Sequence, residues 1–132
     1  MERSRLLKSN ASSSYNLRSL DLKASDVIAI ANILKSENQK GNGYVTSISF
    51  SFNHDLGDLG AEALSKSLPN SLTEIGLVGC EIGDKGGLHI LEGIKKMPHL
   101  NMICIENNKF SEALKNEFRT YSNSKPHMLI VV

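Results

Sequence analysis

The chain is 132 residues long, and its 15 lysines and arginines almost balance its 14 aspartates and glutamates. This length fits a single domain, and the near-zero net charge argues against a nucleic-acid partner held by a strong basic excess. No apolar run approaches the roughly 18–20 residues that cross a bilayer, and the two cysteines are too few for a disulfide framework, so we expect a cytoplasmic protein without a membrane partner.

Four segments with apolar residues at their first, fourth and sixth positions, and the start of a fifth, recur along the chain. They begin near residues 17, 45, 72, 100 and 128, at intervals of 28, 27, 28 and 28 residues. This near-constant spacing predicts a repeat architecture in which each segment is a short strand. Alternate side chains of a strand point to opposite faces, so the apolar residues are expected inside. Residues 1–16 are predicted to be a flexible or capping segment, and residues 17–132 the repeat domain.

Between consecutive strands the apolar residues return every three or four positions, which predicts an amphipathic helix in each repeat. The second and third repeats carry a Gly-Asp-x-Gly turn before this helix, at residues 57–60 and 83–86. We expect Asp58 and Asp84 to cap the helix that each turn begins. Gly60 and Gly86 are expected to let the helix pack closely on the strand.

The ninth position of each repeat carries a small polar or thiol side chain. Such a side chain can bond to the backbone of its turn, and stacked repeats would continue these bonds as a ladder. The predicted ladder residues are Ser25, Asn53, Cys80 and Asn108.

The third repeat, LTEIGLVGCEIGDKGGLHILEGI, resembles the ribonuclease-inhibitor-like class of leucine-rich repeats, and the second, VTSISFSFNHDLGDLGAEALSKSL, shares its turn. The resemblance extends over residues 17–132. It implies an α/β leucine-rich-repeat solenoid of about four to five repeats, shaped as a short horseshoe with parallel strands on the concave face and helices on the convex face. It also implies a protein-binding module, for which inhibition of a partner by occlusion is one mechanism and an enzyme or another effector is a candidate partner.

In its small size, and with no Sec signal expected, the protein also resembles leucine-rich-repeat effectors that intracellular bacteria such as Legionella deliver into the host-cell cytoplasm. An ordinary eukaryotic cytosolic adaptor is the alternative. The resemblance names no partner, and it leaves open whether binding inhibits or recruits.

The spacer residues of the strands are expected on the concave face, which is polar toward its N-terminal side and apolar toward its C-terminal side. An exposed apolar patch bordered by acids is typical of a protein-docking surface, and the alternative is that these residues are simply solvated or covered by the N-terminal tail. The candidate partner-binding residues are Asp21, Lys23, Ser49, Ser51, Phe52, Glu74, Val78, Met102, Cys104, Glu106, Asn107 and Ile130.

The last strand, residues 128–132, is apolar, with Val131 predicted in the second inward position and Ile130 facing outward. Unpaired backbone groups at a sheet edge can pair with another chain. A self-associating structural adaptor that uses this C-terminal edge is therefore the alternative function, although a homo-oligomer is not favoured over a strand that simply closes the sheet.

The histidines, cysteines and acids show no spacing typical of a metal or catalytic site. The glycine-rich turns lack the spacing of phosphate-binding loops, and no histidine is placed to activate Cys104. Pro98-His99 and Pro126-His127 lie 28 residues apart and are explained by repetition of a turn. We therefore expect no enzymatic activity, metal or cofactor.

Overall fold

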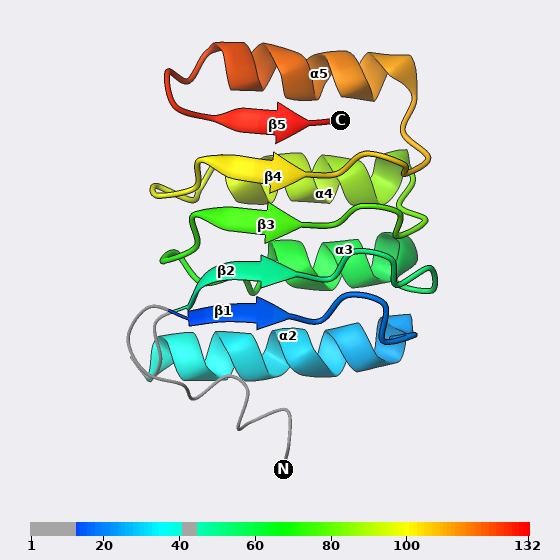
Figure 1. Cartoon of the computed structure of the whole chain (residues 1–132), viewed down its shortest axis with the longest axis vertical. Helices are drawn as coiled ribbons and strands as arrows, with labels where there is room; N and C mark the ends of the chain where they lie inside the picture. Colours follow the sequence, from blue (N-terminus) through cyan, green and yellow to red (C-terminus); the bar gives the residue numbers. More distant parts are fainter. Residues whose placement is uncertain (1–12, 41–44) are drawn as a thin grey trace.

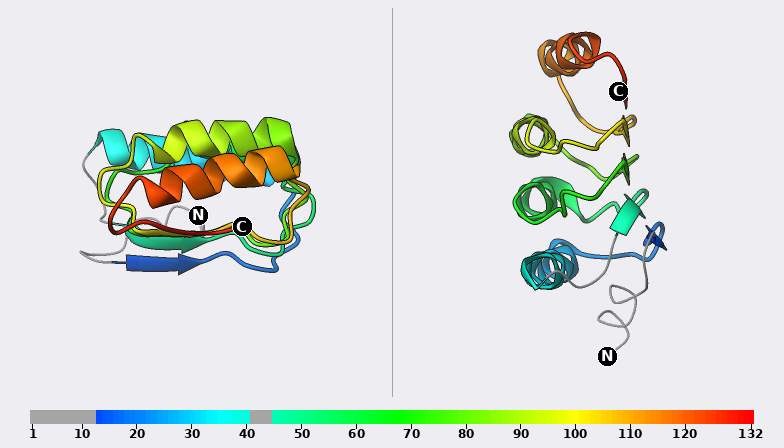
Figure 2. Two further views of the ribbon diagram at one scale, coloured as in Figure 1. Left: turned by 90° about the horizontal axis from the view of Figure 1, so that it is seen from above. Right: turned by 90° about the vertical axis from the view of Figure 1, so that its left-hand side faces the viewer.

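The computed structural model describes residues 13–40 and 45–132, which form one five-stranded parallel sheet with helices on one side (Figure 1). Strands and helices alternate along the chain, and the sheet order follows the chain order. Seen along the strands, the sheet and the helices form two layers with the core between them (Figure 2). The elements are β1 (Ser13–Asn16), α2 (Ala24–Gln39), β2 (Val45–Ser49), α3 (Gly57–Ser65), β3 (Glu74–Gly76), α4 (Asp84–Ile94), β4 (Met102–Cys104), α5 (Glu112–Asn123) and β5 (Leu129–Val131).

One buried residue from every strand forms a continuous row through the sheet. Tyr15 aligns with Ile48, and Ile75, Ile103 and Ile130 follow in register on the next three strands. All five side chains are buried, and burying a large apolar side chain contributes about 1.5–3 kcal/mol. Because strand side chains alternate between faces, this row turns the neighbouring spacer residues away from the helices.

The first repeat begins earlier than we predicted. β1 occupies Ser13–Asn16, and its Tyr15 pairs with Ile48, 33 positions later. Much of the extra length lies in α2, which has 16 residues where the other helices of the described ranges have 9 to 12. The repeat start predicted near residue 17 therefore falls after β1, and residues 13–16 form the edge strand of the sheet. The rest of the predicted N-terminal segment, residues 1–12, lies outside the described residues.

Leucines at positions 17, 20 and 22 imitate the strand pattern but follow β1 instead of forming it. The Leu17 N–H donates to the Ser49 carbonyl at 2.8 Å, as the Phe50 N–H does to Gly76. Leu17 is therefore the equivalent of Phe50, the last apolar position of its strand segment. Leu20 lies in the following loop with 54% of its surface exposed.

The last strand is shifted by one residue from its predicted register. Ile103 pairs with Ile130, 27 positions later, although the preceding Pro-His pairs are 28 apart. A shift of one residue exchanges the two faces of a strand. Ile130 consequently points inward and is only 8% exposed, whereas Leu129 and Val131 face outward opposite Met102 and Cys104.

Asn53 attaches the loop of the first repeat to the second. Its Nδ2 donates to the Leu17 and Phe50 carbonyls at 2.8 and 2.7 Å, and its Oδ1 accepts from the Leu20 and Leu22 N–H groups at 3.1 and 2.9 Å. The side chain is 0% exposed, so these four bonds satisfy buried backbone groups that would otherwise have no partner.

Asn108 makes the same four bonds between the fourth repeat and the third, to the backbone of Leu77, Cys80, Ile82 and Ile105. The Cys80 thiol donates to the Phe50 carbonyl at 3.3 Å and so joins the third repeat to the second. Ser25 does not take part as predicted, because the earlier start of β1 places it within α2. Leu20 holds the equivalent position of the first repeat.

Asp58 and Asp84 bond to the following repeat instead of capping their own helices. Asp58 Oδ1 accepts from the Gly83 and Gly86 N–H groups at 2.7 and 3.0 Å, at the start of α4. Asp84 Oδ1 accepts from the Ser111 N–H at 2.8 Å, just before α5. A Cβ on Gly86 would lie 2.9 Å from the Asp58 Cα, so this glycine permits close contact between helices and not, as predicted, between helix and strand.

Candidate functional site

The side of the sheet that the helices leave uncovered is called the open face here (Figure 2). Its two rows of spacer residues follow from the strand register. Neighbouring strands lie about 4.8 Å apart, so these rows form one continuous surface. The open face consists of Ser14, Asn16, Ser47, Ser49, Glu74, Gly76, Met102, Cys104, Leu129 and Val131.

The open face has two chemically different ends. The polar end, on β1 and β2, consists of Ser14, Asn16, Ser47 and Ser49, and the apolar end, on β4 and β5, of Met102, Cys104, Leu129 and Val131. Gly76 lies between them, where a Cβ would come within 2.8 Å of the Ser49 hydroxyl oxygen. Leu129 is 54% exposed, and Met102, Cys104 and Val131 are half-buried, so the apolar end presents one exposed and three partly accessible side chains.

Most of the predicted partner-binding residues lie together on or beside the open face. Ser49, Glu74, Met102 and Cys104 belong to its two rows. The remaining four, which follow the strands at the rim, are Phe52, Val78, Glu106 and Asn107.

Four predicted site residues do not contribute to this face as expected. Asp21 and Lys23 lie in the loop after β1 and at the start of α2. Ser51 is buried, and its hydroxyl accepts from the Val78 N–H at 3.0 Å. Ile130 points into the core because of the register of β5.

Sequence reasoning missed Ser14, Asn16, Leu129 and Val131 on the open face, and Arg18 beside it. The alternation of buried Tyr15 and Leu17 with polar neighbours was the available signal for β1. For β5, the distance from Ile103 to its partner Ile130 is one residue shorter than the distance between the two Pro-His pairs. No pattern in the sequence indicated this shift.

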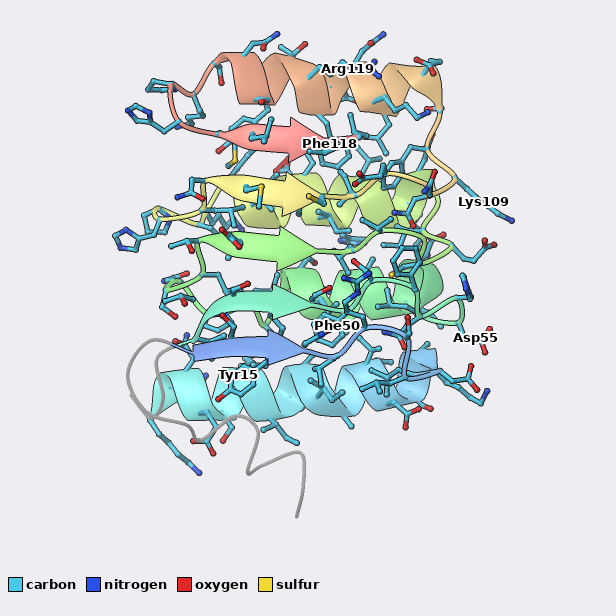
Figure 3. All side chains as sticks on the ribbon, in the orientation of Figure 1. Tyr15, Phe50, Asp55, Lys109, Phe118 and Arg119 are labelled. Atoms are coloured by element: carbon cyan, nitrogen blue, oxygen red, sulfur yellow. The ribbon has the colours of Figure 1, made fainter. Side chains whose placement is uncertain are left out.

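The edge of the sheet at which the strands end carries charged side chains that are paired within the molecule. Figure 3 shows Asp55 and Lys109 extending from this edge. Lys23 lies 3.4 Å from Asp55, and Lys109 lies 2.8 Å from Glu81. A hydrogen bond from Lys109 to Glu81 raises the pKa of the lysine. These charges therefore have partners already, whereas Glu74 and Glu106, beside the apolar end, have no ion-pair partner among the residues that the structure describes.

Phe52 occupies an unusual backbone conformation at the rim of the open face. Its φ of 63° lies in the left-handed region. The residues at the same position of the other repeats, Ser19, Gly79 and Asn107, also have a positive φ. This region costs a residue with a side chain roughly 1 kcal/mol or more. Phe52 is nevertheless 37% exposed, so the burial that offsets that cost is incomplete.

The Phe52 ring is held between two neighbouring repeats. A Cβ on Gly79 would lie 3.1 Å from the Phe52 Cδ1 atom, so the ring rests on the glycine of the next repeat. The Arg18 guanidinium of the preceding repeat lies 5.3 Å from the ring centroid, within the range of a cation–π contact. The ring is thereby preorganised at the surface.

Glu106 and Glu74 give the apolar end an acidic border. The Oε1 atom of Glu106 is buried and has no hydrogen-bond partner within the described part of the chain. Burial raises the pKa of the Cys104 thiol, and the negative charges of Glu106 and then Glu74 raise it further. This thiol is therefore protonated at neutral pH, the opposite of what a nucleophilic cysteine requires.

The described residues contain no group of three or more histidine, cysteine, aspartate or glutamate side chains that could hold a metal ion. Within residues 13–40 and 45–132, no helix has the length and apolar character of a membrane span.

Residues 41–65 and 69–91 match the family model described as Leucine Rich repeat. These segments correspond to the second and third repeats and include β2, α3, β3 and most of α4. No curated protein matches the chain significantly. Together with the parallel sheet and the alternation of strands and helices, the match shows that the fold is an α/β leucine-rich-repeat solenoid. Domains of this kind generally mediate protein–protein interaction and are typically not enzymes.

Proposed function

We propose that this protein binds a partner protein through the apolar end and the rim of the open face. The observation that carries the proposal is the partly exposed apolar group on β4 and β5, bordered by two carboxylates without ion-pair partners in the described ranges. Protein interfaces combine an apolar centre with a polar rim in this way. The desolvated Oε1 atom of Glu106 is best satisfied by a lysine or arginine of the partner.

Phe52 extends the proposed interface along the rim. Exposed aromatic residues contribute strongly to binding when a partner buries them. Its ring is fixed by Arg18 and Gly79 before binding, so little side-chain entropy is lost on association.

Binding of this kind would act by occlusion. A rigid sheet can cover a cleft or surface on its partner at a low entropic cost. The resemblance to ribonuclease-inhibitor-like repeats supports an enzyme, or another effector, as the covered partner. Cytoplasmic residence belongs to the same proposal and rests on the absence of a long apolar run and on the low cysteine count. Delivery into a host cell by a non-Sec secretion system rests on the resemblance to bacterial leucine-rich-repeat effectors.

The test is affinity capture from a host-cell lysate with immobilised wild-type protein and the double variant Met102→Arg, Glu106→Lys. Both changes oppose the proposed contact, by adding a charge to the apolar end and by reversing the charge of its border. A partner bound through this face should be recovered at a tenth or less of the wild-type amount, on the order expected for loss of central interface contacts.

A matched control carries Ala113→Arg and Glu117→Lys, two equivalent changes at exposed positions of α5. This variant should recover the partner as the wild type does. Equal recovery by all three proteins would exclude the open face as the binding surface.

Self-association through β5 is the second candidate function. Among the described strands, β5 pairs on one side only, with β4, and exposed edges of this kind can pair with a second copy. Leu129→Lys should then lower the molar mass that light scattering reports at high concentration. A monomeric mass for the wild type at every concentration would exclude this alternative.

A further inference from the structure

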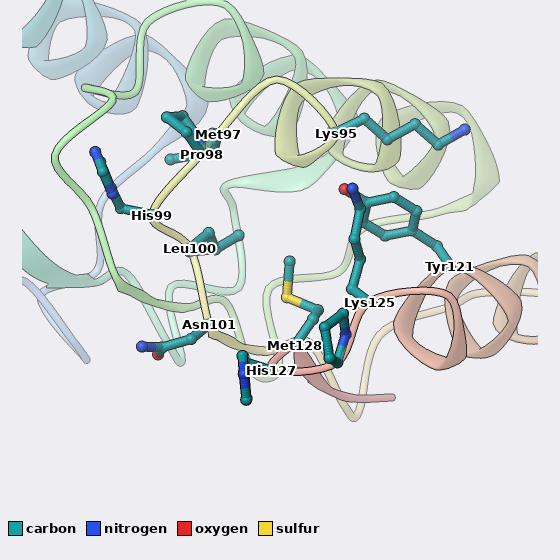
Figure 4. A pocket seen from close by; sticks show the side chains of 11 residues that line it. Lys95, Met97, Pro98, His99, Leu100, Asn101, Tyr121, Lys125, His127 and Met128 are labelled. Atoms are coloured by element: carbon teal, nitrogen blue, oxygen red, sulfur yellow. The ribbon is translucent and has the colours of Figure 1, made fainter.

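A pocket lies between the fourth and fifth repeats, on the edge of the sheet at which the strands begin (Figure 4). It has a volume of about 360 Å³. Its apolar part consists of Met97, Leu100, Met128 and the ring of Tyr121, and Leu100 and Met97 are themselves buried. The pocket is distinct from the open face, since Met102, Cys104 and Glu106 do not line it.

Basic side chains surround this apolar part. Lys95, His99, Lys125 and His127 line the pocket. The Nζ atoms of Lys95 and Lys125 lie 5.9 and 5.8 Å from the centroid of the same ring, that of Tyr121. Two ammonium groups drawn toward one ring repel each other, and a bound anion would relieve that repulsion.

The pocket contains no compensating acid. No aspartate or glutamate of the described chain is among its lining residues. Lys95 has an exposed ion pair with Glu92 at 3.4 Å, whereas no ion pair within the described ranges involves Lys125, His99 or His127. The charge of Lys125 is therefore unneutralised within the described residues, although the whole chain carries only +1.

A pocket of similar volume one repeat earlier shows that this charge is not a general property of the solenoid. It is lined by Lys66, His89 and Glu92, among others. Glu62 lies 2.9 Å from the Lys66 Nζ and 3.8 Å from the His89 Nε2. There Lys66 and His89 both lie near the carboxylate of Glu62, whereas in the later pocket Lys95 has an ion pair and Lys125 has none within the described ranges.

We infer that the pocket between the fourth and fifth repeats binds an acidic peptide segment of a protein partner, with an aliphatic side chain beside its carboxylates. Charge complementarity selects the carboxylates. The apolar part selects a peptide over a free inorganic anion, because an anion alone would leave Leu100, Met128 and the Tyr121 ring without a contact. This inference does not rest on the proposed role of the open face.

The test is an NMR titration of the full chain, at low ionic strength, with the acetylated and amidated peptide Asp-Glu-Leu-Glu-Asp. Amide shifts should concentrate at residues 99–101 and 125–128. The neutral analogue Asn-Gln-Leu-Gln-Asn and the analogue with glycine in place of leucine should each bind more weakly, as should inorganic phosphate.

The variant Lys95→Gln, Lys125→Gln should weaken binding of the acidic peptide about tenfold, because two of the basic groups are lost. The matched control Lys85→Gln, Lys109→Gln removes the same charge from outside this pocket and should change the affinity less than about twofold. The histidine variant His99→Gln, His127→Gln leaves both lysine–tyrosine contacts in place and should also weaken binding.

Equal losses in the lysine and control variants would overturn the inference, because they would show general charge attraction. Phosphate binding as tightly as the peptide would reduce the pocket to a small-anion site, and preferential binding to vesicles of anionic phospholipid would assign a membrane ligand instead. Absence of localised shifts up to millimolar peptide would overturn it as well. None of these outcomes bears on the open face, which the Met102 and Glu106 variant tests separately.

Discussion

The polar and apolar ends of the open face share one backbone architecture and differ in almost every side chain. Beneath both ends the same inward row continues, from Tyr15 and Ile48 to Ile103 and Ile130. On the surface, serines and an asparagine on β1 and β2 give way to methionine, cysteine, leucine and valine on β4 and β5. The interior thus conserves the stacking of the repeats, while the spacer residues are free to determine what the surface binds.

The two ends also differ in how their polar groups are satisfied. Asn53 forms four internal hydrogen bonds beneath the loop of the first repeat. At the other end the buried Oε1 of Glu106 has no partner in the described part of the chain. An unsatisfied buried acceptor costs stability, so the two ends differ in how completely the described chain satisfies its own polar groups.

The largest expected effect concerns the ladder position, which holds a buried asparagine in the second repeat and an exposed leucine in the first. Asn53→Ala removes four bonds and should lower the free energy of unfolding by about 3 kcal/mol, because buried backbone groups lose their partners. Urea denaturation of the purified protein measures the change. Leu20→Ala, at the equivalent but exposed position, should alter it by less than about 0.5 kcal/mol; similar losses in both variants would contradict the structural role of the asparagine.

A smaller effect concerns the contact at the rim. Gly79→Ala should lower the free energy of unfolding by about 1–2 kcal/mol, because its left-handed backbone is strained by a Cβ that also meets the Phe52 ring. In a Phe52→Asn background only the strain should remain. A double-mutant cycle by thermal unfolding isolates the difference, and an additive cycle would show that the ring does not rest on Gly79.

The smallest effect probes the acidic border of the apolar end. Glu106→Gln removes a negative charge that raises the pKa of Cys104, so the thiolate becomes easier to form and the alkylation curve moves to lower pH. We expect iodoacetamide to react about two- to threefold faster at pH 8. Glu92→Gln, on α4, serves as the control and should leave the alkylation rate unchanged. An unchanged rate in the Glu106 variant would show that the charge of Glu106 does not influence the Cys104 thiol.

Cys80 should behave differently from Cys104 in the same experiment. Burial raises the pKa of the Cys80 thiol and also shields it from reagents. Its alkylation should therefore follow unfolding of the protein, and mass spectrometry of the two cysteine-containing peptides distinguishes the sites.

The repeat pattern of the sequence alone was enough to predict the solenoid, its alternating elements and most of the open face. The apolar residues that recur at fixed spacing must point into the core of the stacked strands. Because strand side chains alternate between faces, the sequence predicted that Glu74, Met102 and Cys104 point outward. The sequence also identified Asn53 and Asn108, because a buried asparagine after each strand has few other uses than bonding the backbone of its turn.

Only the tertiary structure decided the registers at the two ends and the pocket between the last repeats. Leucines 17, 20 and 22 have the spacing of a strand although they follow β1, and the choice of β1 depends on which backbone groups can pair with β2. At β5 a single missing residue exchanges inside for outside, because strand side chains alternate with a period of two. Lys95 and Lys125 meet at one tyrosine ring because α4 and α5 stack side by side, a proximity that no local pattern encodes.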